Sequence, residues 1–527
     1  MRLNKILLCV VCVTPFLGGC GGGGSSGATV ATSTVHGTLI ENPPLRVASL
    51  NAADLTAQLN ASVSGQQLLA LSGAPTCGID YHYLQYWTVG GAGETVTATG
   101  VLMVPTAAPG ASAAIVAQCS GPRPIVVYAH GTASQKTFNM AAVGDSTNPG
   151  YSESALMGAM FAAQGYIVVA PNYAGYDTSS LPYHPYLNAV QQSGEMVDAL
   201  TAARSALGHI FAAGTTDNGK LFLTGYSQGG HVAMATHRAM QAAGMTVTAS
   251  APMSGPYALG AFADAIFFGD VDLGATVFSP FLTTSYQKAY GNIYSATSDI
   301  YAPPYAAGIE TLLPNVLPVA TLFQQNQLPQ TAMFNSIAPN GTGNATLDAL
   351  FPTITPPTTP AAQAPLFALG FAPTNYLVNN SYRAAFVADA LLHPDGAVPT
   401  VTTGLPAVAP ANTLRQAFKT NDLRNWQPVA PVMLCGGHGD PTVFYNVNTL
   451  VMQAYWAHLP IPLQVIDVDG GAAPVGALQQ GFAQAEGVIS AAAGGGVAGQ
   501  NAVLQAYHAQ LVPPFCSLAV RGFFAQF

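Results

Sequence analysis

The segment KLFLTGYSQGGHVAMATHRAM, residues 220–240, decides the fold. It places Ser227 at the centre of a G-x-S-x-G pattern, after a short apolar run and before a helical pattern that ends at Gly244. The pattern alone means little, because the chain has 55 glycines and residues 23–27 match it within a Gly/Ser-rich stretch. A strand, a sharp turn and a helix around a serine, however, lift its hydroxyl above the edge of a sheet. Ser227 is therefore a candidate nucleophile on a predicted strand–turn–helix unit.

Short apolar segments alternate with helical patterns on both sides of this unit. The expected strands are residues 81–89 and 95–105, a hairpin around the turn 90–94, followed by 124–128, 166–171, 220–224, 245–252, 429–437 and 463–468. The expected helices are residues 154–163, 188–207, 229–243 and 446–458. Alternating strands and helices favour the α/β class, with a mostly parallel sheet covered by helices on both faces.

The alternation is interrupted by a long insertion. Residues 257–427 are rich in Pro, Ala, Thr and Asn, with helix-like pieces such as residues 379–392. A segment of this length is too long for a loop, so we expect a mainly helical lid inserted into one core. The core is then made of residues 46–256 and 428–527. Within the second part, the Ala/Gly-rich residues 470–499 have room for one helix.

The N-terminus has the pattern of a secretory signal. A basic start, Arg2 and Lys5, precedes an apolar run at residues 6–17, which is too short to span a bilayer comfortably. The run ends in Leu17-Gly18-Gly19-Cys20, which resembles the lipobox of bacterial lipoproteins, where the cysteine carries the lipid; the alternative is an ordinary signal with a stray cysteine. We therefore expect a signal peptide at residues 1–19, lipidation of Cys20 and a flexible tether at residues 20–45. The protein would be an exported lipoprotein, anchored to the outer membrane or cell surface, or secreted.

The charge pattern argues against two classes of partner. Only 7% of the residues are charged, the formal net charge is −9, and no basic cluster occurs. Nucleic acid is therefore not an expected partner. No run of 18 or more apolar residues follows the signal, so no transmembrane helix is expected and membrane contact would come from the lipid anchor.

Four of the seven cysteines lie beyond the signal and the lipobox: Cys77, Cys119, Cys435 and Cys516. In an exported protein they suggest two disulfides, for which three connectivities are possible. We expect Cys77–Cys119 and Cys435–Cys516, because each pair then falls within one part of the core. The alternative is four free buried thiols.

A nucleophilic serine requires a histidine and an orienting carboxylate. In the α/β-hydrolase order, the acid follows the serine and comes before the histidine. Asp440 is the one carboxylate between residues 427 and 458, and it comes three residues after an expected strand. Its competitors, Asp467 and Asp469, lie in or at the end of the next strand, so Asp440 is the predicted acid.

The histidine should follow the last strand. Of the eleven histidines, His508 alone lies beyond Val468. His438 and His458 precede that strand, and structural roles are expected for them. His508 is therefore the predicted base; the alternative for it is a surface histidine near the C-terminus.

Acyl transfer also requires backbone N–H groups that stabilise a developing oxyanion. The residue after the nucleophile, Gln228, supplies one in this kind of site. The loop after the strand at residues 124–128 supplies the other, and we expect Thr132 to be that donor, with Gly131 as the second choice. His130 is expected to brace the loop through hydrogen bonds.

Five segments carry a resemblance to a known family. They are YAHGT (128–132), APNYAGYD (170–177), HPYLN (184–188), GYSQGG (225–230) and GDPTVFYNVN (439–448). These segments look like those of the secretory-lipase family of α/β hydrolases, and the similarity spans residues 80–257 and 428–516. It implies an α/β-hydrolase fold with a large lid inserted before the strand that carries the acid. It also implies cleavage of carboxylic esters, often acylglycerols, by Ser227, Asp440 and His508.

The expected function is hydrolysis of a small-molecule or lipid ester, with no metal and no cofactor. A triad does not itself choose between ester and amide, so a peptidase or amidase on the same fold is the alternative. A non-catalytic, surface-anchored binding protein is a further alternative from a different class. The acyl chain length and the alcohol part of the substrate are left open by these residues.

Overall fold

The computed structural model describes residues 35–210, 214–396, 406, 409–470 and 476–527. The expected signal peptide, Cys20 and most of the expected tether lie outside the described residues. The last part of the expected tether belongs to the fold, because Leu39 pairs with Tyr86 and is buried at the sheet edge. Strand β1 (Leu45–Leu50) then runs antiparallel to β2 (Gly78–Val89). The folded chain therefore begins before residue 46, the residue at which the sequence analysis placed the start of the core.

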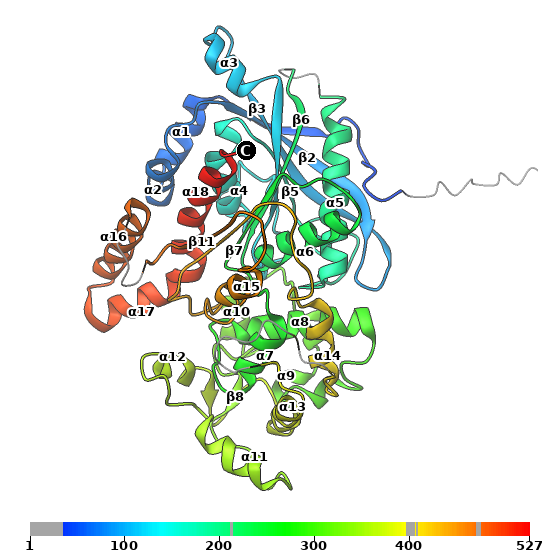
Figure 1. Ribbon diagram of the computed structural model, residues 1–527, viewed down its shortest axis with the longest axis vertical. Coiled ribbons are helices and arrows are strands. Elements are labelled where there is room, and N and C mark those ends of the chain that lie inside the picture. The colour runs from blue at the N-terminus through cyan, green and yellow to red at the C-terminus, as the bar shows by residue number, and fades with distance from the viewer. Residues whose placement is uncertain (1–34, 211–213, 397–405, 407–408, 471–475) are drawn as a thin grey trace, which may run out of the picture. The chain divides into compact units, whose positions relative to one another are not determined.

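The core is one nine-stranded sheet with the order β1-β2-β3-β5-β4-β6-β7-β10-β11 (Figure 1). In this order, the first three pairings, from β1 to β5, are antiparallel. The remaining pairings, from β5 through β4 to β11, are parallel. The bounds are β2 Gly78–Val89, β3 Thr95–Thr106, β4 Pro122–Ala129, β5 Ile167–Pro171, β6 Thr216–Tyr226, β7 Ala249–Met253, β10 Val432–Gly436 and β11 Leu463–Asp467. The expected α/β architecture is confirmed.

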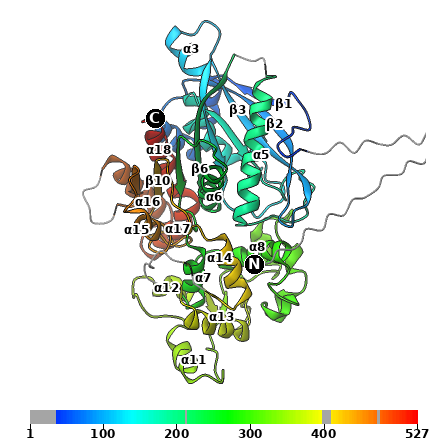
Figure 2. The same cartoon turned by 45° about the vertical axis from the view of Figure 1, so that its right-hand side comes forward.

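Helices cover both faces of this sheet (Figures 1 and 2). Helices α5 (Ala189–Leu207) and α6 (Gln228–Ala242) pack together on one face, and α4 (Tyr151–Met160) and α18 (Val512–Phe524) pack together on the other. Strands β5 and β7 are buried along their whole length, as expected for central strands between two helical layers. The main hydrophobic core lies between these layers.

Several helices lie where the sequence analysis expected none. They are α1 (Ala52–Asn60), α2 (Val63–Ser72) and α3 (Ala113–Cys119), and α17 (Gly496–Ala506), which follows α16 (Ala477–Ala492). The Ala/Gly-rich segment, with room for one helix, thus contains α16 and the start of α17. The glycines at 494, 495 and 496 all have positive φ, which ends one helix before the next begins. Helix α15 (Thr449–Trp456) lies within the helix expected at residues 446–458.

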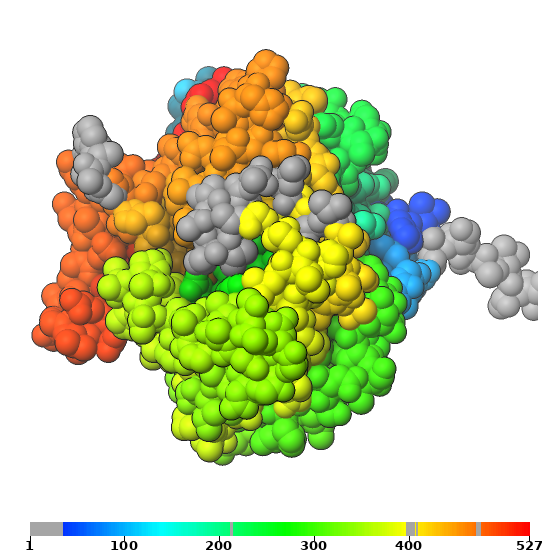
Figure 3. Space-filling view, turned by 60° about the horizontal axis from the view of Figure 1, so that its bottom comes forward, coloured from blue at the N-terminus to red at the C-terminus, as the bar shows by residue number. Residues whose placement is uncertain are grey.

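The insertion between β7 and β10 is mainly helical, as expected. In Figure 3 it forms the lower part of the view, coloured green to yellow. Its elements are α7 Leu259–Phe267, α8 Ala275–Tyr290, α9 Pro303–Ala306, α10 Val319–Gln324, β8 Phe334–Asn335, α11 Ala345–Leu350, α12 Ala364–Ala368, β9 Phe371–Ala372, α13 Asn380–Leu392 and α14 Thr413–Asn421. The lid has its own apolar core. Arg415 of α14 is buried between Asp264 of α7 (2.7 Å) and Asp389 of α13 (2.8 Å), so one guanidinium joins three lid helices. Buried charges of this kind are stable only when paired, as they are here.

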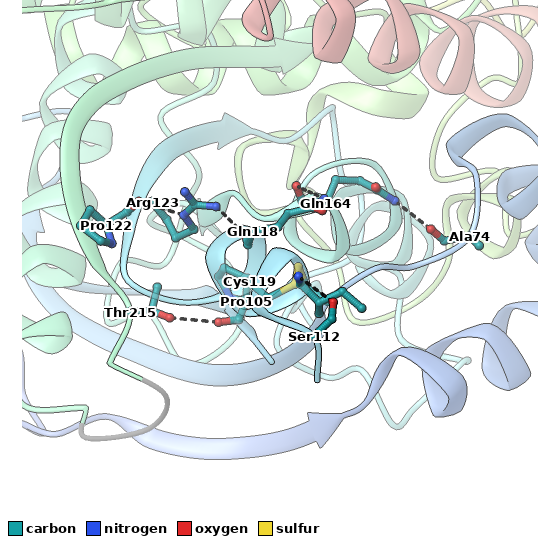
Figure 4. The surroundings of a disulfide bond; sticks show 11 residues. Ala74, Pro105, Ser112, Gln118, Cys119, Pro122, Arg123, Gln164 and Thr215 are labelled. Atoms are coloured by element: carbon teal, nitrogen blue, oxygen red, sulfur yellow. Dashed lines mark hydrogen bonds between the residues drawn. A yellow bond between two sulfur atoms is a disulfide. The ribbon is translucent and has the colours of Figure 1, made fainter. Parts of the chain in front are cut away.

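The cysteines form the two expected disulfides. Cys77–Cys119 joins the end of α3 to the start of β2 (Figure 4). Beside it, Arg123 donates to the carbonyl of Gln118 at 2.5 Å, and Gln164 donates to the carbonyl of Ala74 at 3.4 Å. This disulfide lies just before the start of β4, whereas Ser227 follows the end of β6, the parallel neighbour of β4. None of the described helices has the length and apolarity needed to cross a bilayer.

Candidate active site

Ser227 lies at a sharp turn between β6 and α6. Its backbone has φ 59° and ψ −121°, which is strained for a non-glycine residue and is typical of a nucleophile elbow. A Cβ atom at Gly229 would come 1.9 Å from the carbonyl oxygen of Ala129, and one at Gly225 would come 2.3 Å from that of Gly229. Both glycines of the pattern are thus required by the close approach of neighbouring backbones.

The structure brings the three predicted residues into one chain of hydrogen bonds. Nε2 of His508 lies 2.8 Å from Oγ of Ser227, and Nδ1 of His508 lies 2.7 Å from Oδ2 of Asp440. Ser227 is 7% exposed and Asp440 is 4% exposed, so both are largely shielded from water. In this arrangement the imidazole can accept the serine proton, and the carboxylate can hold the ring with Nδ1 protonated.

Asp440 is fixed by the loop that follows β10. Its Oδ1 accepts the backbone N–H groups of Thr442 (2.9 Å) and Val443 (3.1 Å), which leaves Oδ2 for His508. Of the two competing carboxylates, Asp467 pairs with His438 at 2.9 Å and Asp469 accepts from Tyr507 at 2.6 Å. His508 pairs with Asp440 and with neither competitor.

His508 lies in a π-helical turn, Tyr507–Leu511, between α17 and α18. The N–H of Val512 donates to the carbonyl of Tyr507 in the wider π pattern. The same pattern would pair the carbonyl of His508 with residue 513, but Pro513 has no N–H. The hydroxyl of Tyr226, next to the nucleophile, donates to this carbonyl instead. Tyr226 therefore holds the histidine turn, a role that the sequence analysis missed although Pro513 marks the free carbonyl.

The loop after β4 lies beside the nucleophile. A Cβ atom at Gly131 would be 3.8 Å from Cβ of Ser227. The N–H of Gly131 donates to Oε1 of Glu153 at 3.0 Å and is therefore occupied. The N–H groups of Thr132 and Gln228 donate to no residue in the described part of the chain. The N–H groups of Thr132 and Gln228 are thus unoccupied in the described residues, whereas that of Gly131 is bonded to Glu153.

His130 supports this loop through hydrogen bonds and ring stacking. Its ring nitrogens contact the carbonyl oxygens of Gly131 (2.6 Å) and Asn172 (3.1 Å), and its ring stacks on Tyr173 at 4.0 Å. Burial lowers the pKa of His130 to about 4, so the ring is neutral at neutral pH. These contacts match the structural role expected from the sequence.

Two further buried side chains contact residues at or beside the candidate donors, and sequence reasoning missed both. Glu153 of α4 accepts from Tyr128 at 2.9 Å as well as from Gly131, and burial raises its pKa. His184 contacts the carbonyl of Ala174 through Nδ1 (2.9 Å), and its Nε2 lies 2.6 Å from Nε2 of Gln228. Burial lowers the pKa of His184 to about 3, so the neutral ring accepts from the Gln228 amide. The HPYLN segment was the one sequence signal for His184.

The sequence matches no protein-family model and no curated protein. Among solved structures, the chain is similar to a ligand-bound form of the rice cell wall degrading esterase LipA from Xanthomonas oryzae, with a TM-score of 0.64 and 24% identity over 93% of this chain and 98% of that chain. The chain has the α/β-hydrolase fold. It is also similar to a candidate hydrolase from Legionella pneumophila, with a TM-score of 0.57 and 19% identity over 82% of this chain and 91% of that chain. At these identities the likeness establishes the fold.

A cavity opens between the α/β-hydrolase core and the lid, and Ser227 and Gln228 form part of its wall. Most of the lining is apolar and comes from the lid; it includes Leu259, Phe262, Ile266, Phe278, Leu282, Met333 and Phe418. Such a lining suits a hydrocarbon chain, because burial of apolar surface is favourable and needs no polar partner. Within the described residues, no group of His, Cys, Asp and Glu side chains could hold a metal ion.

The disulfide Cys435–Cys516 joins β10, which leads to the acid loop, to α18, which follows the histidine turn. We expect the double variant Cys435→Ala, Cys516→Ala to lose about tenfold in kcat/KM for an ester while still folded, because small misplacement of reacting groups is costly. Circular dichroism and kinetics on the same samples measure this. The matched control is Cys77→Ala, Cys119→Ala, which removes the distant disulfide. Equal activity of the two double variants and the wild type would show that Cys435–Cys516 does not organise the site.

Proposed function

We propose that the protein is a serine hydrolase that cleaves carboxylic esters, a lipase or esterase of the secretory-lipase type. The observation that carries the proposal is the hydrogen-bond chain from Ser227 through His508 to Asp440, at the wall of an apolar cavity. The likeness of the fold to that of an esterase agrees with it.

The proposed reaction has two acyl-transfer steps. His508 takes the proton from Oγ of Ser227, which attacks the ester carbonyl carbon to give a tetrahedral intermediate. The N–H groups of Thr132 and Gln228 stabilise the oxyanion, each contributing about 3 kcal/mol. His508 then gives its proton to the leaving alcohol, and an acyl group stays on Ser227. Water, activated in turn by His508, attacks the acyl-enzyme and releases the acid.

The cavity supports a substrate with an apolar part. We infer that the lid, residues 257–427, is the wall against which the hydrocarbon part of the ester binds. Ser279 and Thr283 are the lid hydroxyls in a lining that is otherwise mainly apolar. An apolar chain therefore fits this wall better than the polar backbone of a peptide, whose amides would lose hydrogen bonds to water there.

Comparison of an ester with an amide tests the proposal. We expect the purified protein to hydrolyse p-nitrophenyl esters of fatty acids and to show no comparable activity on amino-acid anilides. The rate should rise with acyl chain length while the chain fits the cavity and fall beyond that, because each buried methylene contributes about 0.8 kcal/mol. Faster hydrolysis of the anilides would assign the site to a peptidase or amidase, and turnover of neither class would favour a binding protein.

A further inference from the structure

One carboxyl group in the cavity wall takes no part in the proposed mechanism. Asp272 lies in the loop between α7 and α8, is 4% exposed and lines the same cavity as Ser227 and Gln228. Neither of its carboxyl oxygens has a hydrogen-bond partner in another described residue, and its own backbone N–H is the one donor that acts on the group there. Asp272 thus differs from Asp264 and Asp389, two buried lid aspartates that pair with Arg415.

The position of Asp272 is set by the acid loop. The N–H of Leu273 donates to the carbonyl of Pro441 at 2.9 Å, and Pro441 directly follows Asp440. The ionisable groups that act on Asp272 through charge are Asp440 and Tyr186. The hydroxyl of Tyr186 in turn lies 2.8 Å from Oγ1 of Thr132, in the loop of the proposed oxyanion donor. Asp272 is therefore held near the reacting groups.

The carboxyl of Asp272 is poised to donate a hydrogen bond. Burial raises the pKa of Asp272 to about 8, and the negative charge of Asp440 contributes a smaller part of this rise. The group is therefore mostly protonated at neutral pH. A protonated carboxyl presents one O–H donor and an acceptor oxygen on adjacent atoms.

A buried polar group without a partner is costly, whereas an apolar side chain of similar size in the same wall is not. The cost disappears when a ligand in the cavity offers a matching polar group. Sites built to hydrogen bond a substrate hydroxyl reject the analogue that lacks it, because the site's own polar group is then left unpaired.

We propose that Asp272 is a substrate-binding residue whose carboxyl group hydrogen bonds to a hydroxyl that the substrate carries within a few bonds of the scissile ester. The preferred substrates are then hydroxylated esters with an apolar chain. The hydroxyl can belong to the acyl part or to the alcohol part of such an ester. This inference rests on the proposed ester hydrolysis and names the substrate class for it.

Two matched pairs of esters test the inference and distinguish the two sources of the hydroxyl. Ethyl octanoate is compared with its β-hydroxylated analogue for the acyl part, and propyl octanoate with monooctanoylglycerol for the alcohol part. We expect the wild type to prefer the hydroxylated member of at least one pair by roughly tenfold in kcat/KM. Asp272→Leu should bring this ratio to about one, and Asp272→Asn, which keeps a donor and an acceptor, should retain part of it.

The matched control is Asp270→Asn. Asp270 is a buried carboxyl two residues earlier whose pKa burial raises to about 7, but it is not part of the cavity lining. This variant should keep the wild-type ratio. Asp272→Leu should not lower the melting temperature, because it replaces an unpaired buried carboxyl by an apolar side chain. If it does not fold, Asp272→Ala carries the same comparison, because it also removes both the donor and the acceptor.

The inference is overturned if the wild type hydrolyses both members of both pairs equally, or if the preference survives in Asp272→Leu. Those results would leave the proposed function intact. A wild type that hydrolyses no ester at all would overturn the proposed function and this inference together, so the two failures are distinguishable.

Discussion

Ser227→Ala is expected to lower kcat/KM for a p-nitrophenyl ester by a factor of roughly 10⁴ to 10⁶, with the fold unchanged. The reason is that no acyl-enzyme can form without Oγ, although the Thr132 and Gln228 donors and the cavity still bind the ester. The residual rate should therefore exceed that of water alone. Steady-state kinetics with a melting curve for each protein measure both quantities.

Ser254→Ala is the matched control for this variant. Ser254 is also buried and follows the neighbouring strand β7 at the same edge of the sheet, but it makes no hydrogen bond with His508. Removing its hydroxyl should change kcat/KM by less than about tenfold. Equal losses in the two variants would mean that Ser227 is not distinguished as the nucleophile.

Asp440→Asn is expected to give the second largest loss, roughly 10⁴-fold in kcat, the size seen when serine proteases lose this carboxylate. The asparagine amide keeps the shape of the side chain, but it favours the wrong tautomer of His508 and cannot stabilise the imidazolium. The bonds from Thr442 and Val443 to Oδ1 can persist, so the loop should keep its place. The pH profile of kcat/KM and a crystal structure of the variant check both points.

Asp467→Asn is the control for the acid. Asp467 was one of the two competing acids from sequence, with Asp469, and in the structure it pairs with His438 at a partly exposed position. An exposed pair of this kind contributes little, about 0–1 kcal/mol, and it does not touch His508. The variant should keep kcat within a few-fold of the wild type. A larger loss from Asp467→Asn than from Asp440→Asn would reverse the assignment of the acid.

The sequence predicted the central part of the fold because buried parallel strands leave a strong local pattern. The apolar runs at residues 124–128 and 166–171 lie within or overlap β4 and β5, and the elbow around Ser227 lies where β6 meets α6. The order serine, acid, histidine also follows from topology, since successive strands present their carboxyl ends at one edge. For this reason Asp440 and His508 could be paired with Ser227 before their geometry was known.

Other parts carry no such local signal. Strand β1 is mostly exposed at the edge of the sheet, so its residues do not alternate clearly, and the sequence analysis expected no strand there. Pro513 and Pro514 argue against a helix, yet α18 accommodates them in its first turn, where their missing N–H groups are not needed. The lid is built by distant contacts such as Arg415 with Asp264, 151 residues apart.

The supporting residues of the site were hidden for the same reason. The surroundings of Glu153, His184 and Asp272 depend on burial and on neighbours brought together by the fold. Isolated acidic or histidine residues in a sequence give no sign of that burial or of those neighbours. Burial is what keeps His184 neutral and Asp272 protonated near pH 7. Sequence patterns identified the candidate reacting groups, and the tertiary structure is needed to identify the residues that surround them.

The central claim, that Ser227 is an activated nucleophile, is tested most directly by covalent trapping. A fluorophosphonate reacts with such a serine by forming a bond from Oγ to phosphorus as fluoride leaves, while the histidine takes the proton. We predict that mass spectrometry finds one phosphonyl group on the wild type, mapped to the peptide that contains Ser227, with loss of ester hydrolysis in proportion to labelling. Ser227→Ala should remain unlabelled. An active wild type that takes up no label, or takes it up at another residue, would contradict the account.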